Sequence, residues 1–587
     1  MHLHRFKLLL VVVAAVVFSA VGTPITIAQD FERYRPKTIP LSPPPPIAPQ
    51  QELPPVEGSD RVLVESLDAV IVLDTEGKVD PDNAFEDAEG IQYDFDASKS
   101  LVRSSGFQSI VNRYLGGEVT LRNLNQMSRD LILYYRKCGQ PVVDIIIPEQ
   151  RITAGSVQIV VIESRIGRVV VEDGCYFEGC DLTKWVECTR RGSRIYESAL
   201  SNDLFWLNQN SFQRVGVDIR PGATDGTSDV FFEVDDVRPW NAYLGYEDTG
   251  VRNLYLERLY SGLIWGNAFG RGGTLSYQYT ADREFRRLHA HAVNYLEPIN
   301  RKWSFQTYGS WATVDPIVNA GVAQNGESWQ VGLGMFRHLV KNRKQDTALS
   351  FGFDFKTTNN NLEFGGISVS ASRADLAQLR FGIQSIKRYC CDEYSIFSFD
   401  TYVGPGSGFT SNATTTDFNS IRPDTSPDYV YGRLRYERLW SLPKRWQFVG
   451  RFRGQAASER LLFSETLGFG GYDSIRGYDQ RTFSGDHGWI VNLEVGPKPW
   501  KRCCLNRPST LRVYGLFDVG TAYIESPRQT FEPADQTLYS VGAGMRWNFG
   551  ERANLRLDYA YGFQDTLFNE EGGRIHFGFV GLFGPRP

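Results

Sequence analysis

Long apolar runs are scarce in this chain of 587 residues. The longest, LLLVVVAAVVFSAVG at residues 8–22, is shorter than the ~20 residues that a membrane-spanning helix requires. It follows the basic start MHLHRFK and precedes the small residues TIA. This order is typical of a signal peptide, so we assign residues 1–28 to one, with an uncleaved signal anchor as the alternative. No other segment predicts a membrane helix.

The chain also has no excess of basic residues. It contains 63 Lys and Arg and 68 Asp and Glu, which gives a formal net charge of −5. This balance speaks against a nucleic-acid partner. Cysteine is scarce too, at 8 residues. Cys175, Cys180 and Cys188 lack the paired ligand spacing of zinc sites, so no metal is predicted. Export permits disulfides, and we expect them among these three and Cys138, with the pairing open.

Motifs for nucleotides, cofactors or catalysis are not found either. Ser484, Asp486 and His487 lie close together in sequence. A catalytic triad needs a base and an orienting residue that converge in space, which proximity in sequence does not provide. We interpret the three as polar loop residues and expect neither an enzyme nor a cofactor.

The chain is rich in glycine and aromatic residues, with 56 Gly, 28 Tyr and 37 Phe, which favours a mainly β protein. After Trp240, segments of about ten residues alternate strictly between two faces. In NLRLDYAYGF, large apolar residues such as Leu555 and Tyr559 face one way, and polar or small residues face the other. This pattern predicts a transmembrane β-barrel over residues 239–587, with a lipid-facing apolar band and a polar lumen.

The barrel region has room for sixteen antiparallel strands at ~22 residues each, connections included. Residues 240–372 can hold seven of them, and no convincing amphipathic helix follows Trp240. The other nine are placed at 373–388, 393–403, 428–440, 446–457, 489–497, 510–523, 537–548, 553–564 and 573–583.

The connections between these strands are of two lengths. Long loops at 404–427 and 458–488 are expected outside the cell. Short connections are expected to be periplasmic turns, and they contain the adjacent pairs Cys390–Cys391 and Cys503–Cys504. The turns are predicted at 389–392, 441–445, 498–509 and 549–552.

Upstream of the barrel, the sequence predicts a linker and two small α/β modules. Residues 29–60 contain LSPPPPIAPQQELPP, whose proline density favours extended structure. Residues 61–164 form the first module, with an acidic loop or insertion at 74–106. Residues 165–238 repeat its plan of strand, helix and strand pair. The first module's helix is expected to end at Gly139 and to present one apolar face, made of Leu121, Leu124, Met127, Leu131 and Tyr135.

The loop at 458–488 has an arginine at its centre, Arg476. An arginine inside a barrel needs a partner, because an unpaired charge away from bulk water is costly. Alternation along LRVYGLFDVGTAY places Asp518 on the luminal face. We therefore predict an Arg476–Asp518 pair that holds the loop in the lumen. A solvated Arg476, or an Asp518 paired with Arg512 on the same face, remain alternatives.

Two motifs in this region resemble those of two-partner secretion transporters, the haemolysin secretion/activation protein family. The first is the sixth-loop core at Ile475, Arg476, Gly477 and Tyr478. The second is the strand motif Phe-x-Asp-x-Gly, matched by Asp518 and Gly520, with Leu516 at the aromatic position and Phe517 after it. YYRKCGQPVVDIIIPEQRITAGSVQIVVIESRIGRVVV is similar to the junction of that family's two polypeptide-transport-associated (POTRA) modules.

The resemblance covers about residues 61–587 and implies a 16-stranded outer-membrane barrel closed by its sixth loop, with POTRA modules in the periplasm. These would capture an unfolded, β-rich exported partner of the haemolysin or adhesin type, and the barrel would pass it to the cell surface. The implied partners are this protein and outer-membrane lipid, and the chain is expected to be a monomer.

Two features depart from the family pattern. Only residues 29–40 precede the proline run, so a full plug helix is not expected. The chain ends FGPRP after Phe583 instead of at the aromatic residue. An outer-membrane insertase and a passive porin remain alternative functions.

Overall fold

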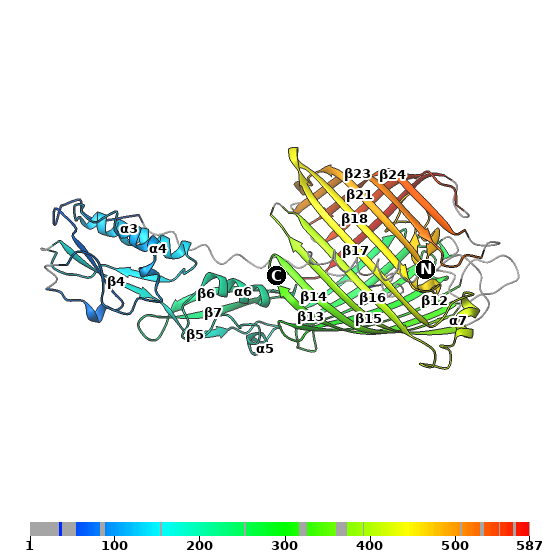
Figure 1. Cartoon of the computed structure of the whole chain (residues 1–587), viewed down its shortest axis with the longest axis horizontal. Coiled ribbons are helices and arrows are strands. Elements are labelled where there is room, and N and C mark those ends of the chain that lie inside the picture. The colour runs from blue at the N-terminus through cyan, green and yellow to red at the C-terminus, as the bar shows by residue number, and fades with distance from the viewer. Residues whose placement is uncertain are drawn as a thin grey trace, which may run out of the picture. The chain divides into compact units, whose positions relative to one another are not determined.

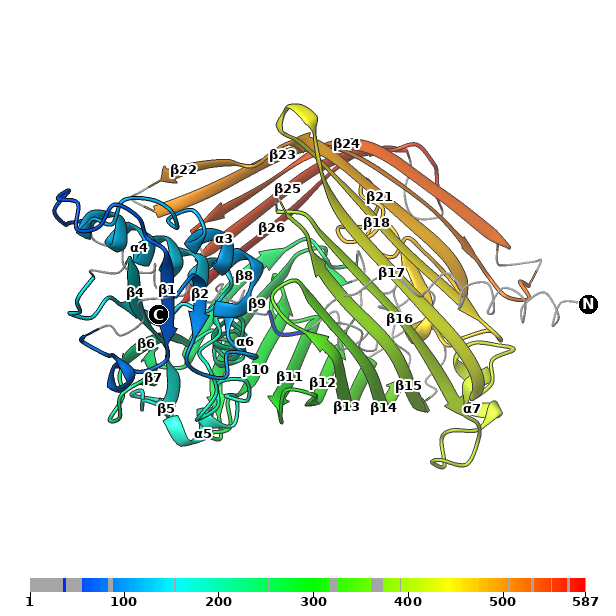
Figure 2. The ribbon, with the colours of Figure 1, turned by 60° about the vertical axis from the view of Figure 1, so that its left-hand side comes forward.

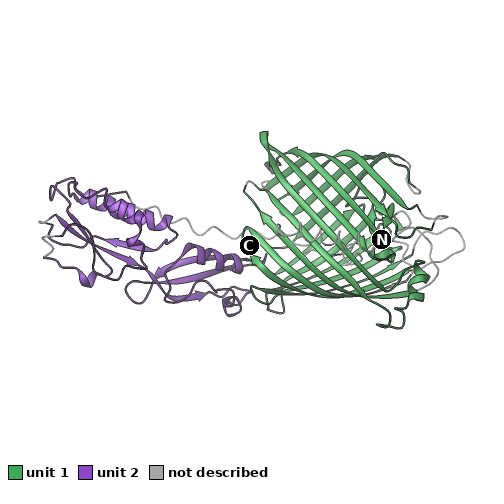
Figure 3. Ribbon diagram, viewed as in Figure 1, with its two compact units in different colours: residues 1–40, 238–586 green, residues 41–237, 587 purple. Residues whose placement is uncertain are grey.

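The structure is a computed structural model that divides into two compact units, residues 1–40 with 238–586 and residues 41–237 with 587 (Figure 3). Each unit is described by itself. The predicted signal peptide and any plug helix lie outside the described residues. The described residues are 35–37, 55–82, 88–152, 155–251, 254–315, 326–359, 373–390, 392–504, 507–528, 533–550, 552–566 and 571–585.

The first module is a four-stranded sheet in the order β2-β1-β4-β3, with helices α3 and α4 on one side (Figure 1). Strands β1 and β2 are parallel, as are β1 and β4, whereas β3 and β4 are antiparallel. The elements are β1 (Ala69–Leu73), η1 (Glu76–Lys78), β2 (Gly90–Tyr93), η2 (Leu101–Arg103), α3 (Ser105–Val111), α4 (Leu121–Lys137), β3 (Val143–Ile146) and β4 (Ser156–Glu163).

The predicted helix of this module is confirmed as α4. Its side chains Leu124, Met127, Leu131 and Tyr135 are buried in the module core. Leu121 is 44% exposed, because it is the first residue of the helix, directly after the capping residue Thr120. Thr120 accepts a hydrogen bond from the backbone N–H of Asn123.

The prediction of an acidic loop at 74–106 is wrong in part. This stretch contains β2, an edge strand that pairs with β1 from Ala69↔Gly90 to Val72↔Tyr93. The four residues of β2 read GIQY, which is too short for alternation to stand out against the acidic residues around it.

The second module is a three-stranded sheet in the order β5-β7-β6. It repeats the strand, helix and strand-pair plan of the first module, as the sequence predicts. Its elements are β5 (Arg165–Val171), α5 (Gly179–Thr183), α6 (Glu197–Leu207), β6 (Gln213–Pro221) and β7 (Thr227–Asp236).

The expected disulfides among these four cysteines are not formed, because Cys138, Cys175 and Cys180 are free thiols, and all four cysteines, Cys188 included, are exposed. Carboxylates fix the cysteine-containing loops instead. Asp236 accepts hydrogen bonds from the backbone N–H groups of Cys175, Tyr176 and Phe177 at 2.8–3.0 Å.

Asp203 does the same at the next loop, where it accepts from the N–H groups of Glu187, Cys188 and Thr189. Among the described residues, one group of potential metal ligands comprises Glu178, Cys180 and Asp181, all exposed. The other cysteines are not part of it, so the C-x4-C-x7-C pattern does not converge on one point.

The barrel unit is a closed antiparallel sheet of 16 strands, in which β21 and β22 together form one strand position because both pair with β23. Figure 2 shows β11 to β16 side by side in sequence order. The first seven strands are β8 (Trp240–Glu247), β9 (Arg258–Ala268), β10 (Gly273–Asp282), β11 (Leu288–Pro298), β12 (Trp303–Val314), β13 (Gly326–Lys341) and β14 (Gln345–Asn359).

The nine strands placed from the sequence are confirmed, two of them, β15 and β18, with the predicted bounds. Strand β26 pairs with β8 and closes the barrel. The bounds are β15 (Arg373–Arg388), β16 (Tyr394–Pro405), β17 (Asp428–Leu442), β18 (Trp446–Ala457), β21 (His487–Pro497) with β22 (Trp500–Cys504), β23 (Arg507–Tyr523), β24 (Asp535–Phe549), β25 (Ala553–Gly562) and β26 (Gly572–Phe583).

Two details of the barrel differ from the prediction. The expected turn at 498–509 is mostly a hairpin, because Trp500–Cys504 pairs with β23. The loop at 404–427 contains a helix, α7 (Thr415–Ile421), with a capping box between Thr414 and Asp417. At seven residues it is too short to show amphipathic periodicity. No helix among the described residues has the length and apolarity needed to cross a membrane.

Part of the predicted linker lies against the barrel wall. The described residues 35–37 belong to the barrel unit. The backbone N–H of Lys37 donates to the hydroxyl of Tyr243 at 3.1 Å, and its ammonium pairs with Glu247 at 3.2 Å. Both partners are on β8, so this segment contacts the first strand of the barrel.

Candidate functional site

The loop between β18 and β21 folds back against the barrel wall and holds most of the predicted site residues. It contains a small hairpin of β19 (Leu467–Phe469) and β20 (Phe483–Gly485) and the short η6 (Phe463–Glu465). The four motif residues lie at the tip of this hairpin. As predicted, the loop follows the eleventh strand of the barrel and contacts the thirteenth, β23.

Arg476 and Asp518 form the predicted pair with two parallel hydrogen bonds. The Nε and Nη2 atoms of Arg476 each lie 2.7 Å from one oxygen of Asp518. The backbone N–H of Arg476 adds a third bond at 3.0 Å. Arg476 is 2% exposed, which rules out the alternative of a solvated loop arginine. Such a bidentate geometry fixes orientation as well as position.

Arg476 has two further carboxylate partners, which the sequence analysis did not identify. Its Nη1 atom lies 3.0 Å from Glu494 on β21 and 3.5 Å from Asp558 on β25. All three carboxylates are fully buried. Arg512, which the sequence analysis named as the alternative partner of Asp518, pairs with Glu494 at 3.0 Å instead.

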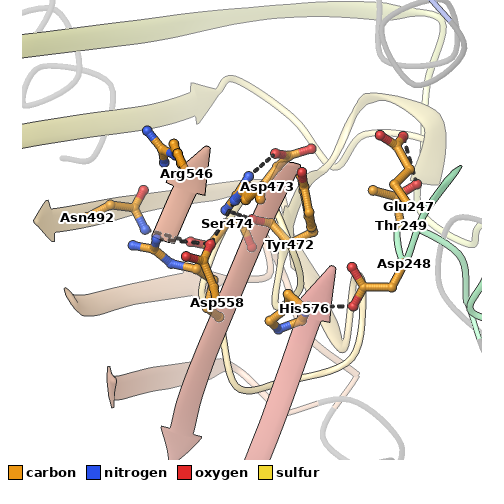
Figure 4. A network of polar contacts seen from close by, with 12 residues as sticks. Glu247, Asp248, Thr249, Tyr472, Asp473, Ser474, Asn492, Arg546, Asp558 and His576 are labelled. Carbon is orange, nitrogen blue, oxygen red and sulfur yellow. Dashed lines mark hydrogen bonds and ion pairs between the residues drawn. The ribbon is translucent and has the colours of Figure 1, made fainter. Parts of the chain in front are cut away.

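Neighbouring polar groups complete the contact between loop and wall (Figure 4). Asn492 donates to Asp518 at 2.8 Å and to the backbone carbonyl of Ser474 at 2.6 Å. The backbone N–H of Gly477 donates to His576 Nε2 at 3.1 Å, and His576 Nδ1 contacts Asp248 at 2.8 Å. The loop tip is therefore tied to β21, β23 and β26.

Ile475 and Tyr478 anchor the tip through apolar contacts. Both are buried in a cluster that also contains Phe469, Ile490, Ala522 and Leu538. The hydroxyl of Tyr478 donates to the carbonyl of Tyr539 at 2.8 Å. The aromatic end of the motif thus fixes the loop to β24.

Gly477 is required by the backbone. Its φ of +93° is unfavourable for residues with a side chain, and a Cβ there would lie 3.0 Å from the backbone nitrogen of Gly562 on β25. Gly520 is similarly restricted, because a Cβ would lie 2.6 Å from the carbonyl oxygen of Trp489 and 3.1 Å from Ile475. Both motif glycines therefore allow the loop to touch the wall.

The two residues before Asp518 face opposite ways, as alternation predicts. Leu516 is 3% exposed and packs with Tyr514 and Ala560 on the inner face. Phe517 is 41% exposed on the outer face. Leu516 thus fills the place where the family motif has an aromatic residue.

The base of the loop has a second anchor, which the sequence analysis missed. Glu465 in η6 is fully buried, and its carboxylate contacts Lys356 on β14 and the hydroxyl of Tyr431 on β17, each at 2.5 Å. In the order of the sheet, β14 lies eight positions from β25, halfway round the barrel. The loop therefore spans the lumen between opposite walls.

Asp486 anchors the returning arm of the loop. Its two oxygens accept from Arg422 at 2.6 and 3.0 Å, and further bonds come from the backbone N–H groups of Leu461 and Glu525. Asp486 is therefore a structural residue that joins three long loops. His487 contacts Glu525, which leaves no triad with Asp486 and Ser484.

Comparisons with known proteins give a consistent result. The sequence model of the haemolysin secretion/activation protein ShlB/FhaC/HecB family matches residues 226–547, and that of the ShlB-type POTRA domain matches residues 91–164. Among curated proteins, the heme/hemopexin transporter protein HuxB of Haemophilus influenzae strain Rd is 22% identical over 462 residues, which cover 77% of this chain and 79% of HuxB.

Solved structures show the same fold. CdiB from Escherichia coli superposes with a TM-score of 0.60 at 17% identity, covering 92% of this chain and 94% of CdiB. BamA from Haemophilus ducreyi lacking POTRA domains 1–3 gives a TM-score of 0.54 at 14% identity, covering 83% and 98%. These similarities establish the fold, which CdiB and BamA share. The function is inferred from the match to the family model instead.

Proposed function

Because the chain belongs to the haemolysin secretion/activation protein family, we propose that it captures one unfolded exported protein in the periplasm and releases it at the cell surface. It is an outer-membrane transporter of the two-partner secretion type, with POTRA modules in the periplasm. We further propose that the substrate is a large β-rich exoprotein of the haemolysin or adhesin type. The transporter acts as a monomer surrounded by outer-membrane lipid.

The outer strands of the two module sheets support the capture step, although the start of β5 is bridged by residues 192–194. In the described part of the chain, β2 and β3 are the outer strands of the first module's sheet, and β5 and β6 those of the second. An extended polypeptide can add to such an edge through main-chain hydrogen bonds. Such main-chain pairing depends little on which side chains the polypeptide carries, so it suits a substrate that arrives unfolded.

The Arg476–Asp518 contact is the observation that carries the transport proposal. It holds a loop across the lumen, and a polypeptide can pass only if that loop moves. A buried ion pair is strongly destabilised when one partner is removed, by ~3–5 kcal/mol. The pair therefore fixes the closed state, and the exported chain must displace it. Since the sequence contains no nucleotide motif, we propose that folding of the substrate outside the cell supplies the free energy for its transport.

The decisive experiment is export of the candidate exoprotein encoded nearby, co-expressed with and without this chain. We expect its appearance outside the cell to depend on this chain. Undiminished export, combined with failure of other barrels to assemble, would favour the insertase. A passive porin would admit small solutes and leave export unchanged.

A further inference from the structure

A cavity inside the barrel is lined by an unusual excess of arginine. It measures about 540 Å³, and nine of its lining residues are Arg whereas two, Glu437 and Asp473, are acidic. The cavity adjoins the tip of the loop, since Tyr472 and Arg476 line it. Part of the positive charge is used to hold the loop, but most of these arginines come from wall strands.

The arginines lie next to one another across the sheet. Arg435 on β17 is directly opposite Arg453 on β18. On the other wall segment, Arg546 on β24 is opposite both Arg512 on β23 and Arg556 on β25. Like charges placed directly opposite each other destabilise a sheet, so the fold itself does not explain them.

The carboxylates that contact these arginines are mostly shared. Asp558 lies 2.7 Å from Arg556 and 3.5 Å from Arg476. Glu494 is shared by four arginines, accepting from Arg451, Arg476, Arg512 and Arg546 at 2.8–3.0 Å. Glu437 lies 3.3 Å from Arg451 and 3.7 Å from Arg435. The side chain of Arg435 remains 43% exposed to the cavity space. The site therefore has guanidinium groups available for further anions.

Three of the wall arginines lie toward the end of the barrel at which β8 begins. Arg546 is near the end of β24 and Arg556 near the start of β25, beside the turn that joins them, and Arg512 is opposite Arg546. Strand β8 begins at this same end, where Ala242 pairs with Phe583 of β26. These three arginines therefore lie between that end of the barrel and Asp518, which follows Arg512 along β23.

We propose that this cavity binds carboxylate groups of the exported polypeptide as it enters the barrel. Guanidinium groups bind carboxylates with paired, charge-assisted hydrogen bonds, and rings of arginine select anions in pores. Binding of acidic side chains would compete with Asp518, Glu494 and Asp558 for Arg476 and so favour release of the loop. This inference rests on the proposed transport function.

The test is binding of a labelled deca-glutamate peptide to the purified full-length protein in detergent, measured by fluorescence anisotropy with deca-lysine as the comparison. We expect deca-glutamate to bind and deca-lysine not to bind. The affinity for deca-glutamate should fall as the salt concentration is raised. Arg435→Gln combined with Arg453→Gln should weaken binding about tenfold.

The matched control is Arg337→Gln with Arg343→Gln, which removes two exposed barrel arginines that do not line the cavity. It should bind like the unchanged protein. Equal binding by the cavity variant and its control overturns the proposal. If deca-glutamate does not bind but the cavity substitutions shift the reversal potential of the pore in a KCl gradient, the site takes small free anions only. That result also overturns the assignment to the exported chain, whereas the export assay separately tests transport.

Discussion

Lys356 on β14 reaches across to Glu465 at the base of the sixth loop, whereas Arg476 at the tip of that loop is bound to Asp518 on β23. The loop is thus held at two points by separate buried ion pairs on different parts of the wall. Release of the tip alone leaves the base attached. Opening of the lumen therefore depends on both contacts.

Arg476→Ala should abolish most export while the barrel still inserts. The substitution leaves Asp518, Glu494 and Asp558 buried without their shared cation, so the loop tip loses its defined position in the lumen and can obstruct the path of the exported chain. Export of the partner and heat-dependent migration of the barrel on gels measure the two effects. Normal export by this variant would contradict the role of the pair.

A charge swap, Arg476→Asp with Asp518→Arg, should restore little. A simple pair would tolerate the exchange, but here a carboxylate at position 476 would face Glu494 and Asp558. Recovery of export to near the unchanged level would show that these two carboxylates contribute little.

Lys356→Met and Glu465→Gln should each increase spontaneous openings of the pore, recorded as current in planar bilayers. Each change removes one partner of a buried ion pair, at a cost of ~3–5 kcal/mol. Lys356→Met combined with Glu465→Met should be milder than Lys356→Met alone, because no unpaired charge remains. If the double variant opens as often as the effects of the two single substitutions added together, Lys356 and Glu465 do not form a direct pair.

Arg422→Ala should expose the sixth loop to added protease on intact cells. Arg422 is buried and binds both oxygens of Asp486. The control is Arg528→Ala, which breaks an exposed pair with Asp424 and should have little effect, because water and salt screen such pairs. Equal cleavage of the two variants would mean that the buried pair does not hold the loop.

Gly477→Ala should reduce the amount of correctly closed barrel, since it combines a positive φ with close contact to Gly562. Gly406→Ala is the matched control: its φ is +89°, but nothing lies within 4 Å of the position that a Cβ would take. Thermal midpoints of the purified variants measure the difference. A similar loss in both would assign the effect to backbone strain alone.

Local sequence patterns were sufficient to predict the strands of the barrel and the pairing of Arg476 with Asp518. Alternation is a property of neighbouring residues, so it locates β15 or β18 without knowledge of the fold. Glu465 and Lys356 are 109 residues apart, and no periodic pattern connects them. Their pairing follows from barrel closure and the path of the loop, which sequence reasoning did not trace.

The helix α7 was only partly predictable from the sequence. Its capping residues Thr414 and Asp417 are a recognisable start signal, but they stand in a loop with only two buried helix residues, Phe418 and Ile421. The expected disulfides failed for a different reason. The spacing of cysteines shows only where a disulfide could form. It does not show that Asp203 and Asp236 already hold the loops that contain Cys188 and Cys175.

The carboxylate clamps at Asp203 and Asp236 have a consequence for the sequence freedom of the second module. Each carboxylate binds the backbone N–H groups of three consecutive residues, so it fixes the path of a loop without using the side chains of that loop. The residues at 175–177 and 187–189 can therefore vary while the loops keep their course, provided that the two aspartates are retained.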